Sequence, residues 1–440
     1  MIHCLLLVAS LLAGQVETPA GETLKSDVRR LVRQLDASEL ARREAAEAEL
    51  LKRGPPILDL LPPPSDRQSA EVRQRLDRVR QKLQQQAADD AARPSTVTLH
   101  ADAMPLSKIL AAFQRQSGNT IIDQRGKRGE GGPEVGDPDL KVNFNKTPFW
   151  KALDQLADQA GLLVYPFTEK AAIVLTTSPN GGTLVLNGMP PAARVPRVGH
   201  ACYSGPFRIE PAGVVAKREL RPLPDGSLSV NVEIAWEPRL RIIGLTQRMA
   251  DVKALDEKGN PLPVADGEAQ LDIPTSGDAP AVKLDLPLRL PSRDVRRIAS
   301  LKGKLLAMIP GKTETFHFDK LPTAKNVEKR IAGVTVTLEQ VSKNNDAWEV
   351  RMTVRFDDAG DALASHRTWI FNNDAHLEGP DGKPIAYDTF ETIAQEKNEV
   401  GIAYLFNTDQ PLAKLTFVYK TPGTIVNSGF EYELKDIELP

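Results

Sequence analysis

Apolar residues near the start of the chain recur with the period of an α-helix. Between residues 24 and 86 they return every three or four positions, in three successive stripes. Gly54, followed by two prolines, ends the second stripe in the way that helices commonly end. Capping-box spacing precedes the second and third stripes, at Asp36 with Glu39 and at Ser65 with Gln68. The pattern therefore predicts three amphipathic helices.

These helices form the first expected unit, residues 22–88. The runs 42–50 and 71–73 resemble parts of a HEAT repeat, and this resemblance covers about one and a half repeats. A plain helical spacer stays open as the alternative. The stretch that follows, up to Pro94, is rich in Gln, Ala and Asp and has no apolar stripe, so it predicts a linker.

After this linker a strand–helix–strand pattern occurs twice. The second copy follows the first at an offset of 43 residues, as from Pro105 to Pro148. In each copy a proline suits the first helical turn, and a glycine, Gly118 or Gly161, suits the left-handed end of the helix. The sequence predicts a small domain of βαββαβ type at residues 97–177.

This order of elements resembles the short N-terminal domain of secretins and TonB-dependent receptors. The resemblance implies a domain that docks partner proteins or gates an assembly. The polar insertion from Gln124 to Asp139 departs from the family, where the connection is short, and predicts a loop. The chain after Thr177 is too short and too charged for a secretin pore or a receptor barrel. The residues that carry the resemblance are Val97–Leu99, Pro105, Leu106, Ile109, Leu110, Gly118, Leu140–Val142, Trp150–Asp154, Gly161 and Leu162.

The second half of the chain alternates apolar and polar residues between turn signals, which predicts antiparallel strands. It contains a second duplication, in which the alternating run 230–236 matches the run 350–356 at an offset of 120. Gly213-Val214 matches Gly333-Val334 at the same offset. Two copies of one β-rich unit are therefore expected.

Further along, the two copies match at an offset of 123, and each is expected to end in an aromatic strand, 316–318 or 430–432. Their length suits immunoglobulin-like sandwiches, although neither copy has the Cys-Trp-Cys signature. The residues matched at this offset are Asp251, Gly259 and Pro261 with Asp374, Gly382 and Pro384. The whole chain is thus expected to be a multidomain α+β protein, with a helical segment, the small domain, and two tandem antiparallel β-sandwiches at residues 195–323 and 328–440.

Composition and the first residues predict a folded protein and the compartment in which it resides. A hydrophobic content of 41% and a charged content of 26% are ordinary for a folded protein. The apolar run 4–14 is shorter than the about 20 residues that cross a bilayer, so it predicts a signal peptide over residues 1–20. A buried N-terminal helix would need a polar face, which this run lacks. We expect an exported chain, periplasmic or extracellular, with no transmembrane segment after cleavage.

Composition and the first residues also limit the modifications and the kinds of partner that are expected. Gln15 stands where a lipoprotein would need a cysteine, so lipidation is not expected. The formal net charge of −2 provides no field that would attract nucleic acid, so no nucleic-acid partner is expected. Cys202 is the single cysteine after cleavage, which leaves no intramolecular disulfide.

Candidate chemistry is sparse. The five histidines outside the signal peptide have no metal-ligand spacing, and zinc and nucleotide-binding motifs are absent from the sequence. Cys202 lies two residues after His200, but a half-buried free thiol is favoured over a nucleophile, because catalytic Cys and His usually come from distant segments. Acidic runs at 130–139 and 357–361 miss the calcium-loop spacing and are expected to be solvated loops. No catalytic, cofactor-binding or metal-binding residue is assigned, and no cofactor is expected.

Three aromatic residues are candidate ligand contacts. Trp369 and Phe371 would share one face of a strand, and Tyr203 lies near Phe207, so they could stack on a sugar. Core packing is the competing interpretation, since a sandwich buries one face of each strand. The leading hypothesis is an exported, non-enzymatic envelope protein that mediates protein–protein interaction, with unidentified envelope proteins as partners. The alternatives are a polysaccharide- or peptidoglycan-binding protein, with cell-wall glycan as its ligand, and a hydrolase.

Overall fold

The computed structural model shows a chain dominated by β-strands. It describes residues 19–63, 65, 67–125, 136–168, 170–176, 200–218, 226–275, 279–357, 359–360, 362–364 and 368–440. Strands make up 47% of the structure and helices 25%, and the strands form several sheets. This confirms the predicted mixed α+β class at that level. The expected signal peptide, residues 1–20, lies almost wholly outside the described residues. None of the described helices is long and apolar enough to cross a membrane.

The N-terminal segment consists of α1 (Pro19–Gln34), α2 (Leu40–Arg53), the 3-10 helix η1 (Pro55–Leu60) and α3 (Ala70–Ala91). The three predicted helices are confirmed, but neither predicted capping box starts its helix, although Gln68 Oε1 does accept from the Ser65 N–H at 3.1 Å. The α3 helix starts after Ser69, whose Oγ accepts from the Val72 N–H, while Ser65 lies in the preceding turn. Asp36 does not cap α2; its carboxylate accepts from Ser69 Oγ at 2.9 Å. It thereby ties the start of α3 to the end of α1.

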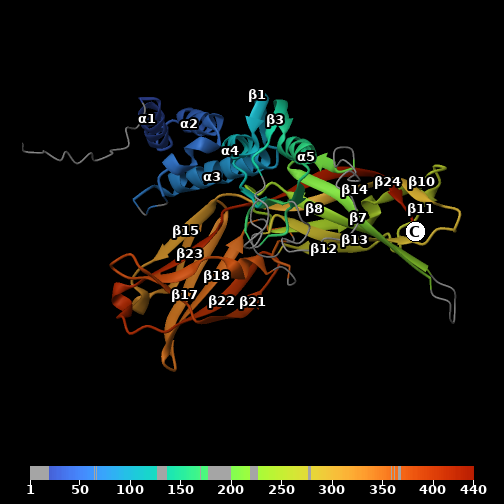
Figure 1. Cartoon of the computed structure of the whole chain (residues 1–440). Helices are drawn as coiled ribbons and strands as arrows, with labels where there is room; N and C mark the ends of the chain where they lie inside the picture. The colour runs from blue at the N-terminus through green and yellow to red at the C-terminus, as the bar shows by residue number, and fades with distance from the viewer. Residues whose placement is uncertain are drawn as a thin grey trace, which may run out of the picture.

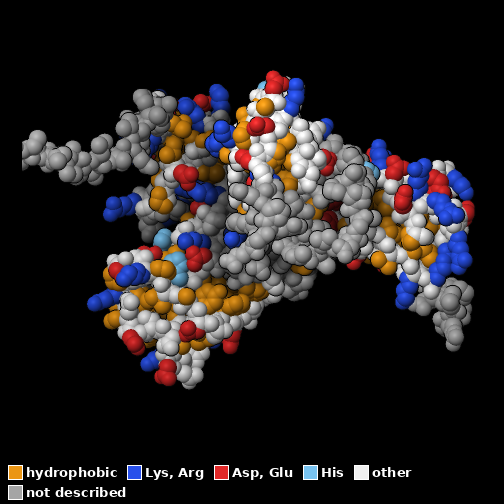
Figure 2. All heavy atoms as spheres, viewed as in Figure 1, with side chains coloured by type: hydrophobic (Ala, Val, Ile, Leu, Met, Phe, Trp, Pro, Cys, Tyr) orange, Lys and Arg blue, Asp and Glu red, His pale blue; other side chains and the backbone are white. Residues whose placement is uncertain are grey.

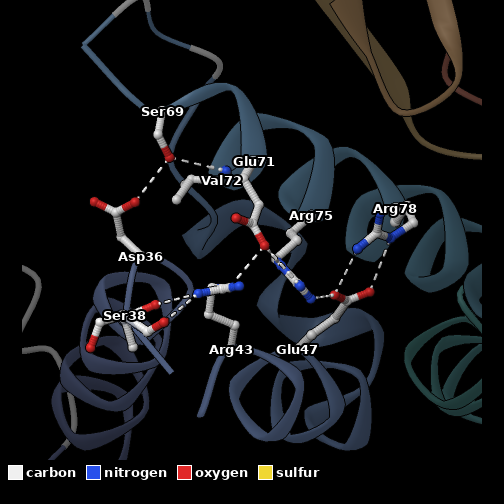
Figure 3. Close-up of polar contacts among 10 residues, drawn as sticks. Asp36, Ser38, Arg43, Glu47, Ser69, Glu71, Val72, Arg75 and Arg78 are labelled. Carbon is white, nitrogen blue, oxygen red and sulfur yellow. Dashed lines mark hydrogen bonds and ion pairs between the residues drawn. The ribbon is translucent and has the colours of Figure 1, made fainter. Parts of the chain in front are cut away.

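A network of charged residues holds α2 against α3 (Figure 3). Glu47 accepts from Arg75 at 2.7 Å and from Arg78 at 3.0 Å, and Arg75 also donates to Glu71. Arg43 joins Glu71 to the turn that precedes α2. Burial raises the pKa of Glu47, but the hydrogen bonds from Arg78 and Arg75 outweigh it and hold that pKa below its usual value.

The small domain contains two helices and two sheets. Its elements are β1 (Thr96–Pro105), α4 (Leu106–Ser117), β2 (Ile121–Asp123), β3 (Asp139–Pro148), α5 (Phe149–Ala160), β4 (Leu163–Tyr165) and β5 (Ile173–Thr176). Strands β1 and β3 pair antiparallel, and β5 lies between β2, to which it is parallel, and β4. Each helix ends at a left-handed glycine, Gly118 with φ 72° and Gly161 with φ 65°, as predicted. Of the predicted insertion, residues 126–135 lie outside the described residues.

The first sandwich packs a four-stranded sheet on a six-stranded one. Its core is formed by the inward residues of both sheets, among them Ile234, Trp236, Leu286 and Leu305. The first sheet contains β13 (Ala281–Arg289), β8 (Gly226–Trp236), β7 (Phe207–Arg218) and β6 (Cys202–Ser204). The second contains β11 (Pro261–Leu262), β10 (Lys253–Asp256), β14 (Arg297–Pro310), β9 (Gly244–Arg248), β12 (Gln270–Pro274) and β24 (Ile425–Glu438).

The second sandwich packs a four-stranded sheet on a five-stranded one, around Val354, Tyr404, Phe406 and Phe417. The four-stranded sheet contains β15 (Thr313–Phe318), β23 (Thr416–Pro422), β19 (Ala375–Glu378) and β20 (Pro384–Ala386). The five-stranded sheet contains β16 (Lys325–Ile331), β17 (Val334–Asn344), β18 (Ala347–Phe356), β22 (Glu399–Phe406) and β21 (Thr389–Gln395).

The two sandwiches exchange strands. β24, the last strand of the chain, pairs with β14 in the first sandwich, and β15 pairs with β23 in the second. The register never breaks: Arg297 lies opposite Glu438, Pro310 opposite Ile425, and Phe318 opposite Phe417. One two-stranded ribbon therefore runs through both sandwiches. The sequence predicts a division into 195–323 and 328–440, and the sheets differ from it at the two aromatic strands. β15 falls within the first range but belongs to the second sandwich, and β24 falls within the second range but belongs to the first sandwich.

The internal repeat holds in part. At the offset of 123, the hairpin β10–β11 matches β19–β20, with Leu255 opposite Pro261 and Glu378 opposite Pro384. Strand β8 matches β18 at an offset of 120 residues, but β7 matches β17 at an offset of 127. The reason is the pairing: Phe207 lies opposite Trp236 in the first sandwich, and Val334 lies opposite Phe356 in the second. Both β7 and β17 have a β-bulge at the equivalent place, residues 211–213 and 338–340. The match of Gly213 with Gly333 is therefore wrong.

Helix α3 lies at the junction of these units (Figure 1). Its Ala88 packs in the first core, and its Gln84 is fully buried where the ribbon passes between the sandwiches. Gln84 Nε2 donates to Glu314 on β15 at 2.6 Å. A Cβ added at Gly423, beside the crossover, would lie 2.3 Å from Gln84 Oε1, so the side chain of Gln84 would have to move. One helix thus contacts α2, the ribbon and both sandwiches.

Candidate interaction site

The small domain binds the first sandwich through a row of residues across its four-stranded sheet. Tyr203, Arg208, Ala235 and Ala281 are successive cross-strand neighbours on β6, β7, β8 and β13, and we name them the first docking row. Helix α5 covers this row. Its Asp154 is completely buried, and its Oδ2 accepts from Tyr203 Oη and from Arg208 Nε, both at 2.7 Å.

The charges in this contact are removed from solvent. Burial alone would lower the pKa of Arg208, but the carboxylates of Asp154 and Glu210 outweigh it and raise that pKa. Burial raises the pKa of Asp154, against the attraction of Arg208 and the hydrogen bond from Tyr203. Asp154 Oδ1 has no hydrogen-bond partner among the described residues. The contact is therefore strongly dependent on both charged partners being present.

A second buried network joins the same two units. Glu237, which is also completely buried, accepts from the Ser95 N–H at 2.8 Å, from Asn119 Nδ2 at 3.1 Å and from Arg239 Nε at 2.6 Å. Arg239 also donates to the carbonyl of Ala91 at the end of α3. The small domain is thus held on the first sandwich by two polar networks, and the linker from α3 is part of one of them.

The second sandwich has a row at the equivalent position. Arg330, Thr335, Arg355 and Glu399 are neighbours on β16, β17, β18 and β22, and we name them the second docking row. Arg330 corresponds to Tyr203. Tyr203 pairs with Arg208, the second residue of β7, and Arg330 pairs with Thr335, the second residue of β17.

Here too the row binds an aspartate of a helix. Arg330 Nε donates to Asp77 Oδ2 of α3 at 2.9 Å, and the Gly333 N–H donates to the other oxygen of Asp77 at 3.3 Å. Arg330 also pairs with Asp357. The side chain of Arg330 remains 41% exposed, whereas that of Arg208 is 5% exposed. The equivalent residues Tyr203 and Arg330 therefore each bind a helix carboxylate. The first row adds Arg208, and the aspartate that it binds is 0% exposed, against 17% for Asp77.

The structure does not bring the three sequence-predicted contact residues together. Tyr203 belongs to the first docking row and is half-buried. Trp369 and Phe371 lie in the second sandwich, on the 3-10 helix η5 (Trp369–Asn372), so the prediction that they share a strand face is wrong. Trp369 Nε1 donates to the Ala362 carbonyl at 2.7 Å, and its ring packs at 6.0 Å on Phe356. Ile370 between them is fully buried and anchors the turn.

Phe371 takes part in an aromatic corner. Its ring stacks on Phe390 of β21, with centroids 5.4 Å apart and planes at 16°. Tyr387 packs edge-on against Phe390 at 6.0 Å. All three rings are half-buried, so they contact the core of the sandwich and also reach the surface next to strand β21.

Other candidate groups have ordinary surroundings. Cys202 is a half-buried free thiol that packs against the first core, as predicted. Asp137 bonds Arg125 and Ser107, and the rest of the acidic run before it lies outside the described residues, as do Asp358 and Asp361. The part of the chain that the structure describes contains no group of three His, Cys, Asp or Glu side chains that could hold a metal ion.

Sequence analysis missed Asp154, Arg208 and Glu237. One signal was available for Asp154: it follows Trp150 and Leu153 on the apolar face of its helix, where a charge needs a buried partner. The fold and these contacts define a class of protein in which helices and tandem β-sandwiches are joined by internal docking rows. Comparison with known proteins found no matching family model, no matching curated protein and no matching solved structure.

Proposed function

We propose that this chain is an exported, non-enzymatic protein of the cell envelope that holds partner proteins in a fixed arrangement. The observation that carries the proposal is the way the units are joined. Buried charge pairs at Asp154 and Glu237, a shared ribbon, and the contacts of α3 fix the helices, the small domain and both sandwiches to one another. A scaffold needs such fixed geometry to present its outer surfaces at constant spacing.

The finer assignment of the units belongs to the same proposal. We propose that residues 97–177 form a domain like the short N-terminal domain of secretins, and the order of its strands and helices supports this. We propose that the tandem sandwiches are immunoglobulin-like and that helices 22–88 are HEAT-like. The apolar run 4–14 supports export. The glycan-binding alternative gains no support from Tyr203 or Trp369, since their polar atoms donate to internal acceptors.

Site-specific crosslinking in native envelopes tests the proposal. Because α5 packs on the first sandwich, deleting residues 97–177 would expose that sheet, so the full chain is required. A photoreactive amino acid is placed at exposed His100 on β1, or at exposed Arg29 on α1, and crosslinked products are identified by mass spectrometry. We expect a reproducible set of envelope proteins shared between irradiated sites and absent without irradiation. Products restricted to lipid or glycan, or no products, would overturn the proposal.

A further inference from the structure

Free sheet edges are the surfaces on which another chain can add a strand, and proteins protect them most often with Lys, Arg or Pro, and also with other charged residues or β-bulges. Among the described edge strands of five or more residues, only β15 and β21 lack all three residue types. The β15 edge is protected from a neighbouring strand, because Lys329 Nζ of β16 donates to the carbonyl of His317. In β21 the last residue, Gln395, donates from Nε2 to the Leu363 carbonyl at 3.0 Å, but among the described residues no side chain binds a backbone carbonyl of the strand.

The exposure of β21 agrees with an open edge. Six of its seven residues, Thr389 to Gln395, are exposed, and only Phe390 is half-buried. Ile393 is one of the few large apolar residues of the described chain that are exposed, at 39%. The one protective feature within the strand itself, besides Glu391, is a β-bulge between Thr392 and Ala394, where the pairing with β22 is interrupted. Figure 2 shows hydrophobic side chains on the second sandwich around β22 and β21, with acidic side chains at its lower margin.

The two faces of β21 differ in chemistry. On the inner face, Phe390 lies opposite Tyr404 and stacks on Phe371, which forms the aromatic corner. On the outer face, Glu391 lies opposite Ala403. Residues 388–399 contain four carboxylates and one lysine, a net charge of 1 − 4 = −3. Of these carboxylates only Glu391 lies on β21, and its charge interacts with that of Arg351 on β18. An added strand would place alternate side chains on the aromatic corner and beside Glu391.

We propose that β21 binds an extended segment of a partner protein, in which apolar and basic residues alternate, as a sixth strand of its sheet. The inference rests on the proposed scaffold function and assigns one of its docking edges. Backbone hydrogen bonds provide affinity, the aromatic corner selects apolar side chains, and Glu391 selects Lys or Arg.

The binding test uses a fluorescent nine-residue peptide of alternating lysine and valine, measured by fluorescence anisotropy with the full chain. Hydrogen exchange should show slower exchange of the amides of residues 389–395 when the peptide is bound. We expect Glu391→Lys or Ile393→Lys to weaken binding at least tenfold. The matched control is Glu328→Lys, the same charge change on exposed β16 at the opposite edge of the same sheet, which should change affinity less than twofold.

Equal weakening by the control, or slower exchange elsewhere than β21, would overturn the proposal. A concentration-dependent dimer that Ile393→Lys abolishes would also overturn it, in favour of pairing between two copies of β21. The envelope crosslinking separates the two levels of inference. For this comparison the photoreactive amino acid is placed at exposed Thr389. If the wild-type chain captures proteins there and the Glu391→Lys chain captures the same set equally, the β21 assignment fails while the scaffold function stands. If the wild type captures none at any of the probe sites, the scaffold function itself fails.

Discussion

Each of the two sandwiches binds a helix aspartate at the edge of one sheet, but through different residues and at different burial. In the first, Asp154 of α5 pairs with Arg208, and their side chains are 0% and 5% exposed. In the second, Asp77 of α3 pairs with Arg330, at 17% and 41% exposed. The first sandwich ends this sheet at β13, which contains Lys283, Pro287 and Arg289, whereas the second continues to β21.

The two docking rows thus hold their aspartates at very different burial. A buried charge pair is costly to break, because the remaining partner stays buried and uncompensated. A solvent-exposed pair contributes about 1 kcal/mol or less. The first docking row holds the small domain on the first sandwich, and the second holds α3 on the second sandwich.

The largest expected effect comes from removing residues 425–440. This truncation should unfold the first sandwich and leave the second folded, although the missing strand directly follows β23 of the second. β24 buries five large residues in the first core, each contributing about 1.5–3 kcal/mol, so the loss is on the order of 10 kcal/mol. That loss is comparable to the whole stability of a domain, about 5–15 kcal/mol. The five residues are Val426, Phe430, Tyr432, Leu434 and Ile437.

Hydrogen exchange with mass spectrometry distinguishes the sandwiches in this experiment. Amides of β7, β8 and β13 should lose protection, while those of β17, β18 and β22 keep it. A chain lacking only Leu439 and Pro440 provides the control. Loss of protection in β17 and β18 instead would mean that β24 stabilises the sandwich from which it follows in sequence, and that the strands are not exchanged.

The next effect concerns the buried pair. Arg208→Met leaves the carboxylates of Asp154 and Glu210 without their guanidinium, and we expect a loss of about 3–5 kcal/mol in the free energy of unfolding. Urea denaturation measures this loss. The double variant Asp154→Leu with Arg208→Met removes both buried charges and should recover most of it. A double variant no more stable than the single one would show that packing around Arg208, rather than its charge, fixes the small domain.

The crossover between the sandwiches gives a smaller effect. Gly423→Ala places a Cβ against Gln84, whose side chain is held by Glu314, and should cost about 1–3 kcal/mol. Adding Gln84→Ala should relieve the contact, so the two changes will not be additive in a double-mutant cycle. Gly267→Ala, whose nearest neighbour would lie at 3.9 Å, is the matched control with little expected loss. Additive losses would contradict the contact between Gln84 and Gly423.

Local structure was largely predictable from the sequence, and pairing over long distances was not. Gly118 and Gly161 required left-handed conformations, and those helix ends follow. The alternation of apolar and polar residues in β15 and β24 predicts which face of each strand is buried. Either strand would fit either sandwich by this criterion, so the exchange of the two strands leaves no signal in the local sequence. The shift from 120 to 127 arises because Phe207 and its partner Trp236 are 236 − 207 = 29 residues apart, whereas Val334 and its partner Phe356 are 356 − 334 = 22 apart.

The docking rows could not be predicted from the sequence either. A row is made of one residue from each of several strands, so its members are far apart in the sequence and share no motif. Tyr203 was selected as a sugar contact because it is aromatic, whereas its hydroxyl donates to Asp154. Trp369 and Phe371 lie on η5 because a short turn there leads into the β19–β20 hairpin, as η3 (Met249–Asp251) leads into β10–β11.

The smallest effect tests the exposed copy of the row. Arg330→Met should cost about 1 kcal/mol or less at low salt, because water screens the pair with Asp77 and replaces its hydrogen bonds. The cost should shrink further in 0.5 M salt, since the screening length falls to about 4 Å at such ionic strength. Urea denaturation at both salt concentrations measures it, with Arg208→Met as the buried reference. A salt-independent cost near that of Arg208→Met would show that the two rows are energetically equivalent, and that exposure does not separate the copies.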